Sequence, residues 1–511
     1  MSTEGQDATQ GGTLEIGASP DGDERAAPDV LDSAAAGPSV IRGGLLRIGG
    51  YAAGTLLAVL SVSLLNRHLG IPGYGRYAVV IGLVTLVQGI TDIGLGQIGV
   101  REFAIRHGGD RARLLRNLLG IRVFLTTVGV ALAVAYAAVA GYGGSLVLGT
   151  LFAGVGMVLT VIQGTFAIPL AAELRLGWVT AMDLLRQLLT VTAIVLLVVA
   201  GAKLLAFLAV SVPVAIGVLV ATLVLVRRAM PLKASFDRAE WITLMRSVLP
   251  FAAATIVGTL YLRSTLVLLP LLTNKYQVGY YAVSYAILSV LLAIPSLTVG
   301  AALPILARAA RDDAERLRYV LGRLTDVMLI VGVWIALSMA LGAGFAVQVL
   351  AAGKSEPSIA VIQIQAFAVI TQFVSASWQY ALLSLRIYRP LMWLSLAAFI
   401  VNLALTLLLV PLLQARGAAL AFTCAEVLGA VVTLVVLVRA RRTLMPSLHI
   451  PVRVLACAVI AGSIVFVPGL SSFTRTVIGS VLYFAALLAL RAVPPEMLDA
   501  LVHRPRAAHR G

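Results

Sequence analysis

Charged residues are scarce in this 511-residue sequence: they make up 12% of it, whereas 60% of the residues are hydrophobic. A soluble globular protein contains roughly 25% charged residues. So few charges cannot cover the surface of a soluble 53.5 kDa fold, and the mean hydropathy is +0.98. Most of the surface must therefore face lipid, which excludes the series of soluble domains that the length alone suggests.

The sequence also lacks the patterns that support catalysis or metal binding. Its two cysteines, Cys424 and Cys457, lie inside apolar runs and are expected to be inert packing residues. There is no zinc-type spacing of cysteine and histidine, no phosphate-binding glycine-rich loop with its lysine, and no nucleophile elbow. We therefore expect neither an enzyme nor a protein with a metal ion or a cofactor.

Long apolar runs dominate the sequence instead. A helix needs about 20 apolar residues to cross the hydrocarbon core of a membrane. Fourteen runs meet this requirement, at 44–66, 76–99, 117–139, 145–168, 178–200, 203–226, 247–271, 279–303, 318–343, 358–384, 390–412, 417–438, 451–468 and 474–492. The sequence thus predicts an all-α integral membrane protein of about fourteen transmembrane helices.

The basic residues give these helices an orientation. The formal net charge is +16, and most arginines and lysines lie in alternate loops. Loops 101–116 and 227–246 contain five basic residues each, whereas the loops on the opposite side contain two at most. The positive-inside rule places the basic loops and both termini in the cytoplasm. The same alternation argues against a nucleic-acid-binding surface.

The two ends of the sequence differ from the apolar runs. Residues 1–40 contain eight acids against one arginine, Arg25, among many glycines, alanines, serines and prolines. They cannot bury enough apolar surface to fold, and they lack the basic start and apolar centre of a signal peptide. We expect 1–40 to be a disordered acidic cytoplasmic tail and 494–511 to be a basic cytoplasmic tail.

A short internal repeat divides the chain. Residues 75–79 read GRYAV and residues 279–283 read GYYAV, and each copy opens a predicted span after a short outward loop. Six spans separate the copies, so both have the same orientation, which indicates a parallel repeat. We therefore expect two six-helix lobes around a central cavity. The predicted units are an N-lobe at 41–228, an amphipathic cytoplasmic connector at 229–246, a C-lobe at 247–440, and spans 13 and 14 at 441–493.

Several short motifs follow one another in a fixed order along the chain. In the first half they are 66–70 (NRHLG), 73–77 (GYGRY) and 92–96 (DIGLG), and in the second half they begin with 278–281 (VGYY). Together they resemble the polysaccharide flippases of the multidrug/oligosaccharidyl-lipid/polysaccharide exporter superfamily. The resemblance spans roughly residues 41–445. It implies alternating access, a lipid-linked oligosaccharide as cargo and the bacterial cytoplasmic membrane as the location. Membrane lipids, a polysaccharide polymerase and glycosyltransferases are the partners that it implies.

Three arginines inside predicted spans are candidates for binding the cargo. A charge near the bilayer centre is costly, so it usually faces a cavity and has a function. Arg263, in span 7, is the strongest candidate because a guanidinium can hold a pyrophosphate through paired donors. Arg47 and Arg122 lie nearer the cytoplasmic ends of their spans. For all three, extension of the side chain to the membrane surface is the competing interpretation.

Two carboxylates inside predicted spans are candidates for ion coupling. Burial raises the pKa of a carboxyl group toward the working range, so Asp92 in span 2 is suited to carry a proton. Asp92 alternatively pairs with Arg47 or ends its helix before Gly94 and Gly96. Glu426 in span 12 is the other candidate, and a hydrogen bond that packs two helices together is its competing role.

The sequence favours a flippase that moves a polyprenyl-pyrophosphate-linked oligosaccharide. Three alternatives stay open: a flippase for the peptidoglycan precursor lipid II, an ion-coupled multidrug exporter of the same superfamily, and a membrane scaffold of a polysaccharide-assembly complex. A drug exporter would favour an anionic, aromatic-lined cavity, whereas the deep charges here include an arginine. The repeat and the buried charges argue against a scaffold without transport. The sequence contains no ATP-binding motif, so we expect an ion gradient, the membrane potential or consumption of the cargo to supply energy.

Overall fold

The computed structural model describes residues 36–173, 175–226, 235–312, 314–353, 355–445 and 449–493. These residues form helices joined by turns and contain no strand. The predicted terminal tails lie outside the described residues, apart from 36–40, which begin the first helix. The prediction of an all-α fold is therefore confirmed for the described part of the chain.

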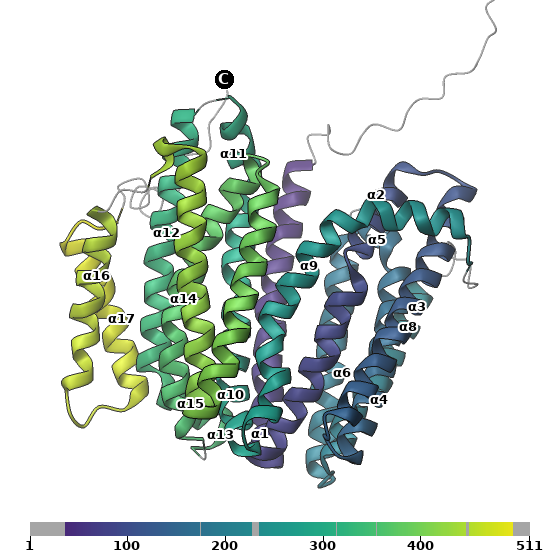
Figure 1. Ribbon diagram of the computed structural model, residues 1–511, viewed down its shortest axis with the longest axis horizontal. Coiled ribbons are helices and arrows are strands. Elements are labelled where there is room, and N and C mark those ends of the chain that lie inside the picture. Colours follow the sequence, from purple (N-terminus) through teal and green to yellow (C-terminus); the bar gives the residue numbers. More distant parts are fainter. Residues whose placement is uncertain are drawn as a thin grey trace, which may run out of the picture.

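The helices before residue 230 form what we call the N-lobe. They are α1 (Ala36–Asp92), α2 (Leu95–Ile105), α3 (Gly109–Val139), α4 (Gly144–Phe166), α5 (Ile168–Ala172), α6 (Leu176–Val199), α7 (Leu204–Ala209) and α8 (Ser211–Val226). They occupy one side of the bundle, on the right in Figure 1.

The remaining helices form the C-lobe and an added pair. The C-lobe comprises α9 (Arg238–Leu272), α10 (Lys275–Leu291), α11 (Ala293–Asp312), α12 (Ala314–Leu341), α13 (Ala343–Ala351), α14 (Pro357–Ser384), α15 (Tyr388–Ala440) and the 3-10 turn η2 (Arg442–Leu444). The pair comprises α16 (His449–Gly462), η3 (Ser463–Phe466) and α17 (Ser472–Ala489). Figure 1 shows α16 and α17 at the far edge, beside α12.

Twelve of the described helices are long and apolar enough to cross a membrane. Two of these, over 52–105 and 390–440, contain 54 and 51 residues. At about 1.5 Å per residue each would be roughly 80 Å long, far more than the roughly 30 Å of hydrocarbon. The backbone leaves the helical conformation inside both, at Gly70 (φ 68°) in the first, which is interrupted again at Gly94 (φ 82°), and at Gln414 (φ 55°) in the second. Each of these two ranges therefore contains two apolar segments. The total of fourteen spans remains a prediction.

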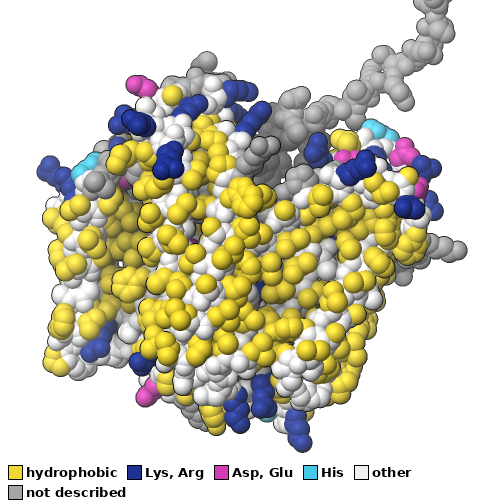
Figure 2. Space-filling view, viewed as in Figure 1, with side chains coloured by type: hydrophobic (Ala, Val, Ile, Leu, Met, Phe, Trp, Pro, Cys, Tyr) yellow, Lys and Arg dark blue, Asp and Glu magenta, His cyan; other side chains and the backbone are white. Residues whose placement is uncertain are grey.

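Charged side chains gather at the two ends of the bundle and apolar side chains cover its middle, as Figure 2 shows for one face. We call the two ends the Gly70 end and the Arg106 end, after a residue in a turn at each. Large apolar side chains are exposed along the helices, among them Leu132, Leu196 and Val220 at 54–66%. Lipid is the solvent that makes this arrangement favourable, and the protein is therefore a multi-pass membrane protein.

The buried core joins the two lobes at the Gly70 end. One cluster of buried side chains includes Leu65 and Phe207 of the N-lobe together with Tyr281 and Phe422 of the C-lobe. At the Arg106 end the buried residues form separate clusters. One contains N-lobe residues with the start of α9, and the other contains C-lobe residues from α11, α12, α14 and α15. The two lobes thus share one buried cluster at the Gly70 end. At the Arg106 end only the start of α9 packs into the N-lobe cluster, and the other C-lobe helices form a cluster of their own.

The two copies of the repeated motif meet at this joined end. A Cβ atom added to Gly75 would lie 2.7 Å from the amide nitrogen and 2.8 Å from the Cα of Gly279. A Cβ atom added to Gly279 would in turn overlap the carbonyl oxygen of Ile71. The backbones of α1 and α10 therefore touch, which only glycine at these two positions permits.

Candidate functional site

Arg122 is fixed inside the N-lobe by partners on two other helices. Its Nη2 lies 2.8 Å from Oδ1 of Asp92 at the end of α1, and its Nη1 donates to Oγ1 of Thr165 on α4 at 3.0 Å. Gly96 and Gly164 lie beside the guanidinium, since a Cβ atom added to either would be in van der Waals contact with Arg122 Nη2 at 3.7–3.8 Å. Arg122 is 7% exposed, so the ion pair, and not the membrane surface, satisfies its charge.

Asp92 ends its helix, which is one of the alternatives that the sequence left open, and it pairs with Arg122, which the sequence did not suggest as its partner. It is the last residue of α1, and Gly94, with φ 82°, separates it from α2. Its partner among the described residues is Arg122, whereas the side chain of Arg47 lies outside the described part of α1. The Asp92 side chain remains 42% exposed, so its second oxygen is accessible while the first one holds Arg122.

A second arginine inside the N-lobe contacts a glutamine of α4. Arg186 on α6 donates from Nη2 to Oε1 of Gln163 on α4 at 2.7 Å. The amide nitrogen of Gln163 then donates to Oγ1 of Thr222 on α8 at 3.0 Å. Gln163 and Thr165 lie two positions apart on α4, so this one helix supports both guanidinium groups. Gln163 is a polar residue within an apolar stretch of α4, and no local pattern shows which arginine it contacts.

Arg263 differs from both N-lobe arginines. It is half-buried on α9, and its guanidinium carbon lies 5.4 Å from the ring centre of Tyr285 on α10. Tyr285 is itself held by a hydrogen bond from its hydroxyl to the carbonyl oxygen of Leu262 at 3.0 Å. Arg263 makes no hydrogen bond or ion pair with any described residue. The aromatic ring therefore supports the guanidinium while its N–H donors stay available to a ligand.

Glu426 lies in the C-lobe close to the helix that carries Arg263. The hydroxyl of Tyr261 on α9 donates to its Oε1 at 2.6 Å, and Glu426 is 6% exposed. With its amide nitrogen turned toward the carboxylate, Gln372 on α14 donates to the same oxygen at 3.2 Å. No described basic side chain pairs with Glu426. Two neutral donors thus satisfy a buried carboxyl group, which is the packing role that the sequence left open.

The predicted site residues therefore form two groups in separate lobes. Asp92 and Arg122 are brought into one ion pair, whereas Arg263 and Glu426 are connected through α9, on which Tyr261 precedes Arg263 by two positions. Sequence reasoning missed Tyr261 and Tyr285. The only sequence signal for them was tyrosine within apolar runs, and that pattern is common in packed membrane helices. Among the described residues no three histidine, cysteine, aspartate or glutamate side chains are grouped so as to hold a metal ion.

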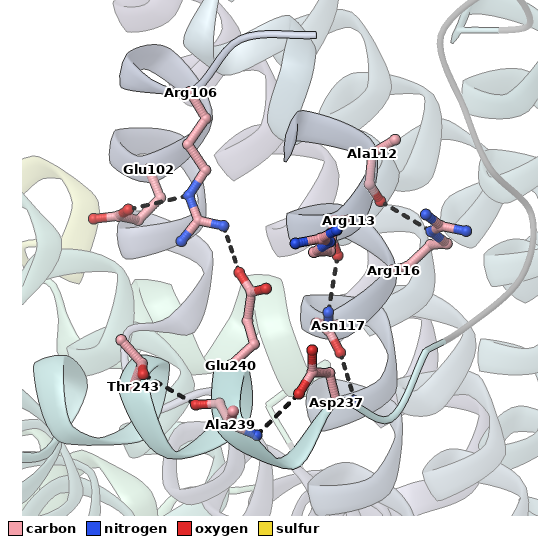
Figure 3. Close-up of polar contacts among 10 residues, drawn as sticks. All are labelled: Glu102, Arg106, Ala112, Arg113, Arg116, Asn117, Asp237, Ala239, Glu240 and Thr243. Carbon is pink, nitrogen blue, oxygen red and sulfur yellow. Dashed lines mark hydrogen bonds and ion pairs between the residues drawn. The ribbon is translucent and has the colours of Figure 1, made fainter. Parts of the chain in front are cut away.

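The start of α9 is attached to the N-lobe by the contacts drawn in Figure 3. Arg106, one residue beyond α2, pairs with Glu240 and lies 3.5 Å from Glu102. Burial lowers the pKa of Arg106, but the hydrogen bond and charge of Glu240 outweigh it, so the pKa is raised above its ordinary value. The backbone nitrogen of Asp237 donates to Oδ1 of Asn117 on α3 at 3.0 Å.

This attachment makes the predicted connector part of a longer helix. The described portion, from residue 235, leads directly into α9, which continues without a break through the C-lobe segment that carries Tyr261 and Arg263. The apolar face of the connector packs on the N-lobe, where Leu244 and Val248 belong to the buried cluster of α2 and α3. One helix thus links the Arg106 end of the N-lobe with the polar groups of the C-lobe.

Comparison with solved structures identifies the architecture. A structure titled as the lipid II flippase MurJ in an inward closed conformation superposes with a TM-score of 0.74 at 10% identity, covering 88% of this chain and 99% of that one. A multidrug resistance MATE family transporter of the MOP superfamily, in an inward-facing conformation, gives a TM-score of 0.61 at 12% identity, covering 78% and 98%. Identities this low establish the fold alone.

Comparison of sequences identifies the family. A protein of Shigella flexneri named "Putative O-antigen transporter" is 39% identical over 75 residues, which cover 15% of this chain and 18% of that protein. This match spans less than a fifth of the relative's length. The model of the family described as "Polysaccharide biosynthesis protein" matches residues 40–310, more than half of the chain. The chain therefore belongs to the polysaccharide biosynthesis protein family.

Proposed function

We propose that the protein is a flippase that moves a polyprenyl-pyrophosphate-linked oligosaccharide across the cytoplasmic membrane by alternating access. The observation that carries this proposal is Arg263, a half-buried guanidinium in an apolar lobe. It lies beside the ring of Tyr285 but has no hydrogen-bond or ion-pair partner among the described residues. The family membership, the name of the Shigella flexneri relative and the flippase fold support the same class of cargo. Nothing in this activity requires a covalent step, so the protein is a transporter and not an enzyme.

The chemistry of Arg263 fits a pyrophosphate. A planar guanidinium donates two parallel hydrogen bonds to phosphate oxygens, and such charge-assisted bonds are roughly twice as strong as neutral ones. An uncompensated cation in the hydrocarbon region costs about 2.5 kcal/mol or more, and an anionic ligand would recover this free energy. Arg122 lacks this property because Asp92 already neutralises it. We therefore assign cargo binding to Arg263, and we leave Arg47 as a second candidate from the sequence.

Replacing Arg263 tests this assignment. Arg263→Ala should abolish surface polysaccharide in cells that depend on this protein, while its amount in the membrane stays normal. Arg263→Lys should retain part of the activity, because the charge remains but the paired donors are lost. Arg416→Ala, which removes an exposed arginine from a turn in α15, is the matched control and should have no effect. Unchanged polysaccharide in Arg263→Ala cells would exclude the proposed role.

Ion coupling is proposed for the two carboxylates, with Glu426 as the stronger candidate. Glu426 is satisfied by neutral donors, so it can take up or release a proton without breaking an ion pair. Asp92 must break its bond to Arg122 to do the same. Glu426→Gln should therefore remove any dependence of transport on a pH gradient in proteoliposomes that contain a fluorescent lipid-linked oligosaccharide. Asp92→Asn provides the comparison, and retained pH dependence in both variants would mean that neither residue couples transport to protons.

A lipid II flippase is the second candidate, favoured by the likeness in fold to MurJ. The two cargoes share a polyprenyl pyrophosphate, so Arg263 does not distinguish them. Competition in proteoliposomes does: unlabelled lipid II should compete weakly with a surface-polysaccharide precursor if our proposal is correct. We also propose that the protein lies in the cytoplasmic membrane with both termini in the cytoplasm. A polymerase and glycosyltransferases are the partners that this function implies.

A further inference from the structure

A pocket of 230 Å³ lies between the two lobes at the Gly70 end. Its N-lobe wall includes Arg76 on α1 and Tyr142 in the turn before α4, and its C-lobe wall includes Thr273 and Lys275 at the turn between α9 and α10. The hydroxyl of Tyr142 donates to the carbonyl oxygen of Val267 on α9 at 2.8 Å. The pocket therefore exists in this form only while the lobes are packed together at this end.

The pocket is cationic on both sides. Arg76 and Lys275 are exposed, and none of the residues that line the pocket is acidic. Arg76 makes no hydrogen bond or ion pair with the described residues, and the amino group of Lys275 lies 5.7 Å from the ring centre of Tyr276. The described segments around this end carry six basic residues (Arg67, Arg76, Lys203, Lys275, Arg416 and Arg475) and a single acid, Glu356, just before α14. Two cations from opposite lobes thus face one cavity without a counter-ion in its walls.

We propose that this pocket binds a phosphate group, supplied by the headgroup of an anionic phospholipid or by soluble phosphate. A water molecule occupies about 30 Å³ in the liquid, so the cavity accommodates a phosphate together with several waters. The bound anion contacts Arg76 on one lobe and Lys275 on the other, and the hydroxyl of Thr273 is a further donor in the walls. Two like charges that face one cavity repel each other, and an anion between them replaces this repulsion by two attractions.

The consequence is a ligand that favours one conformation. Arg76 directly follows Gly75, and Lys275 lies four residues before Gly279, so the pocket borders the place where the two lobes touch. Opening of the Gly70 end separates the two walls and destroys the site. An anion that binds only the closed form shifts the population toward that form. Phosphate at this end therefore holds the Gly70 end shut, independently of the identity of the cargo.

The test compares two double variants of equal charge in lipid nanodiscs. Arg76→Gln with Lys275→Gln removes both cations of the pocket, whereas Lys203→Gln with Arg416→Gln removes two exposed cations from the same end but outside the pocket. We measure the thermal unfolding midpoint in phosphatidylcholine alone, in phosphatidylcholine with phosphatidylglycerol, and in phosphatidylcholine with inorganic phosphate in the buffer. The two supplemented conditions distinguish a lipid headgroup from a free anion as the source.

The wild type and the control variant should gain a few degrees in at least one of the two supplemented conditions, and the pocket variant should gain none. An equal gain in all three proteins, or no gain in any, would overturn the proposal. A spin-label distance between Ser145 on α4 and Gln348 on α13 gives a second readout, with Cys424 and Cys457 replaced by alanine. The supplement that raises the unfolding midpoint should also increase the population with the shorter spin-label distance. This increase should occur in the control variant and not in the pocket variant. Each single variant repeats the test if the double variant does not fold.

Discussion

At the scale of single residues, the contrast between Arg122 and Arg263 is the most informative feature. Both are arginines within predicted spans, yet Asp92 and Thr165 satisfy the first, whereas the ring of Tyr285 is the described neighbour of the second. A buried ion pair that loses one partner is destabilising because a charge is left uncompensated. The first arginine is therefore expected to contribute to stability and the second to binding.

The ion pair gives a prediction about stability. Asp92→Ala leaves the guanidinium of Arg122 buried without a counter-charge and should lower the free energy of unfolding by about 2 kcal/mol. This is less than the 3–5 kcal/mol expected for a fully buried pair, because the Asp92 side chain is 42% exposed. Chemical denaturation in detergent measures the change. The double variant Asp92→Ala with Arg122→Leu should recover most of the lost free energy of unfolding, because no charge is then left uncompensated. If the double variant is as unstable as Asp92→Ala alone, the uncompensated charge is not the cause.

At the scale of secondary-structure elements, the contact between α1 and α10 determines how closely the lobes approach. Gly75 and Gly279 bring two helix backbones together at the residues that the internal repeat relates. A methyl group at either position overlaps backbone atoms, which cannot rotate away as a side-chain end can. Closure of the Gly70 end therefore depends on the absence of two side chains.

This contact predicts the effect of adding one methyl group. Gly75→Ala should force α1 and α10 apart and lengthen the distance between spin labels on Ser145 and Gln348, because closure at the Gly70 end becomes sterically strained. Gly258→Ala is the matched control, since a Cβ atom there meets no atom within 4 Å and alanine favours the helix. Pulsed electron paramagnetic resonance measures the distance. The same distance distribution in Gly75→Ala and the control would show that the helices can move without opening the lobes.

The attachment of α9 to the N-lobe gives a second prediction at this scale. Glu240→Gln removes the charge that pairs with Arg106 and leaves the weaker contact with Glu102 at 3.5 Å. We expect faster amide hydrogen exchange over residues 238–245, by about fivefold, which corresponds to the roughly 1 kcal/mol of a partly exposed ion pair. Arg246→Gln, at an exposed position of the same helix, should leave the exchange unchanged. Equal rates of amide hydrogen exchange over residues 238–245 in the two variants would mean that the Arg106–Glu240 pair does not hold the start of α9.

At the scale of the whole molecule, the two ends of the bundle differ in how the lobes are joined. One buried cluster spans both lobes at the Gly70 end, whereas each lobe has its own cluster at the Arg106 end. Alternating access requires the reverse arrangement in another state, and α9 connects the lobes in both. The described state is therefore closed at the Gly70 end, which is the outward end in the orientation that we propose.

Periodicity and charge were sufficient to predict the helical architecture. Most predicted runs coincide with a helix or half-helix of the structure, because about 20 apolar residues in lipid have no alternative to satisfying their backbone within a helix. Runs 76–99, 203–226 and 279–303 each extend over a break between two helices. The short helix α13 was missed because it lies in an outward turn and is too short to span the membrane. The charged site candidates were found from their position in apolar runs, but their partners were not, since Arg122 and Asp92 lie 30 residues apart.

The sequence by itself determined that this chain lies in a membrane, where its helices run and that it contains a repeat, because composition and hydrophobic runs are local properties. Only the tertiary structure decided which buried charges are paired. The pairing of Arg122 with Asp92 and the free guanidinium of Arg263 depend on which helix faces lie together. The meeting of Gly75 with Gly279 depends on the same packing of one lobe against the other. Such contacts join residues distant in the chain, and no local pattern encodes them.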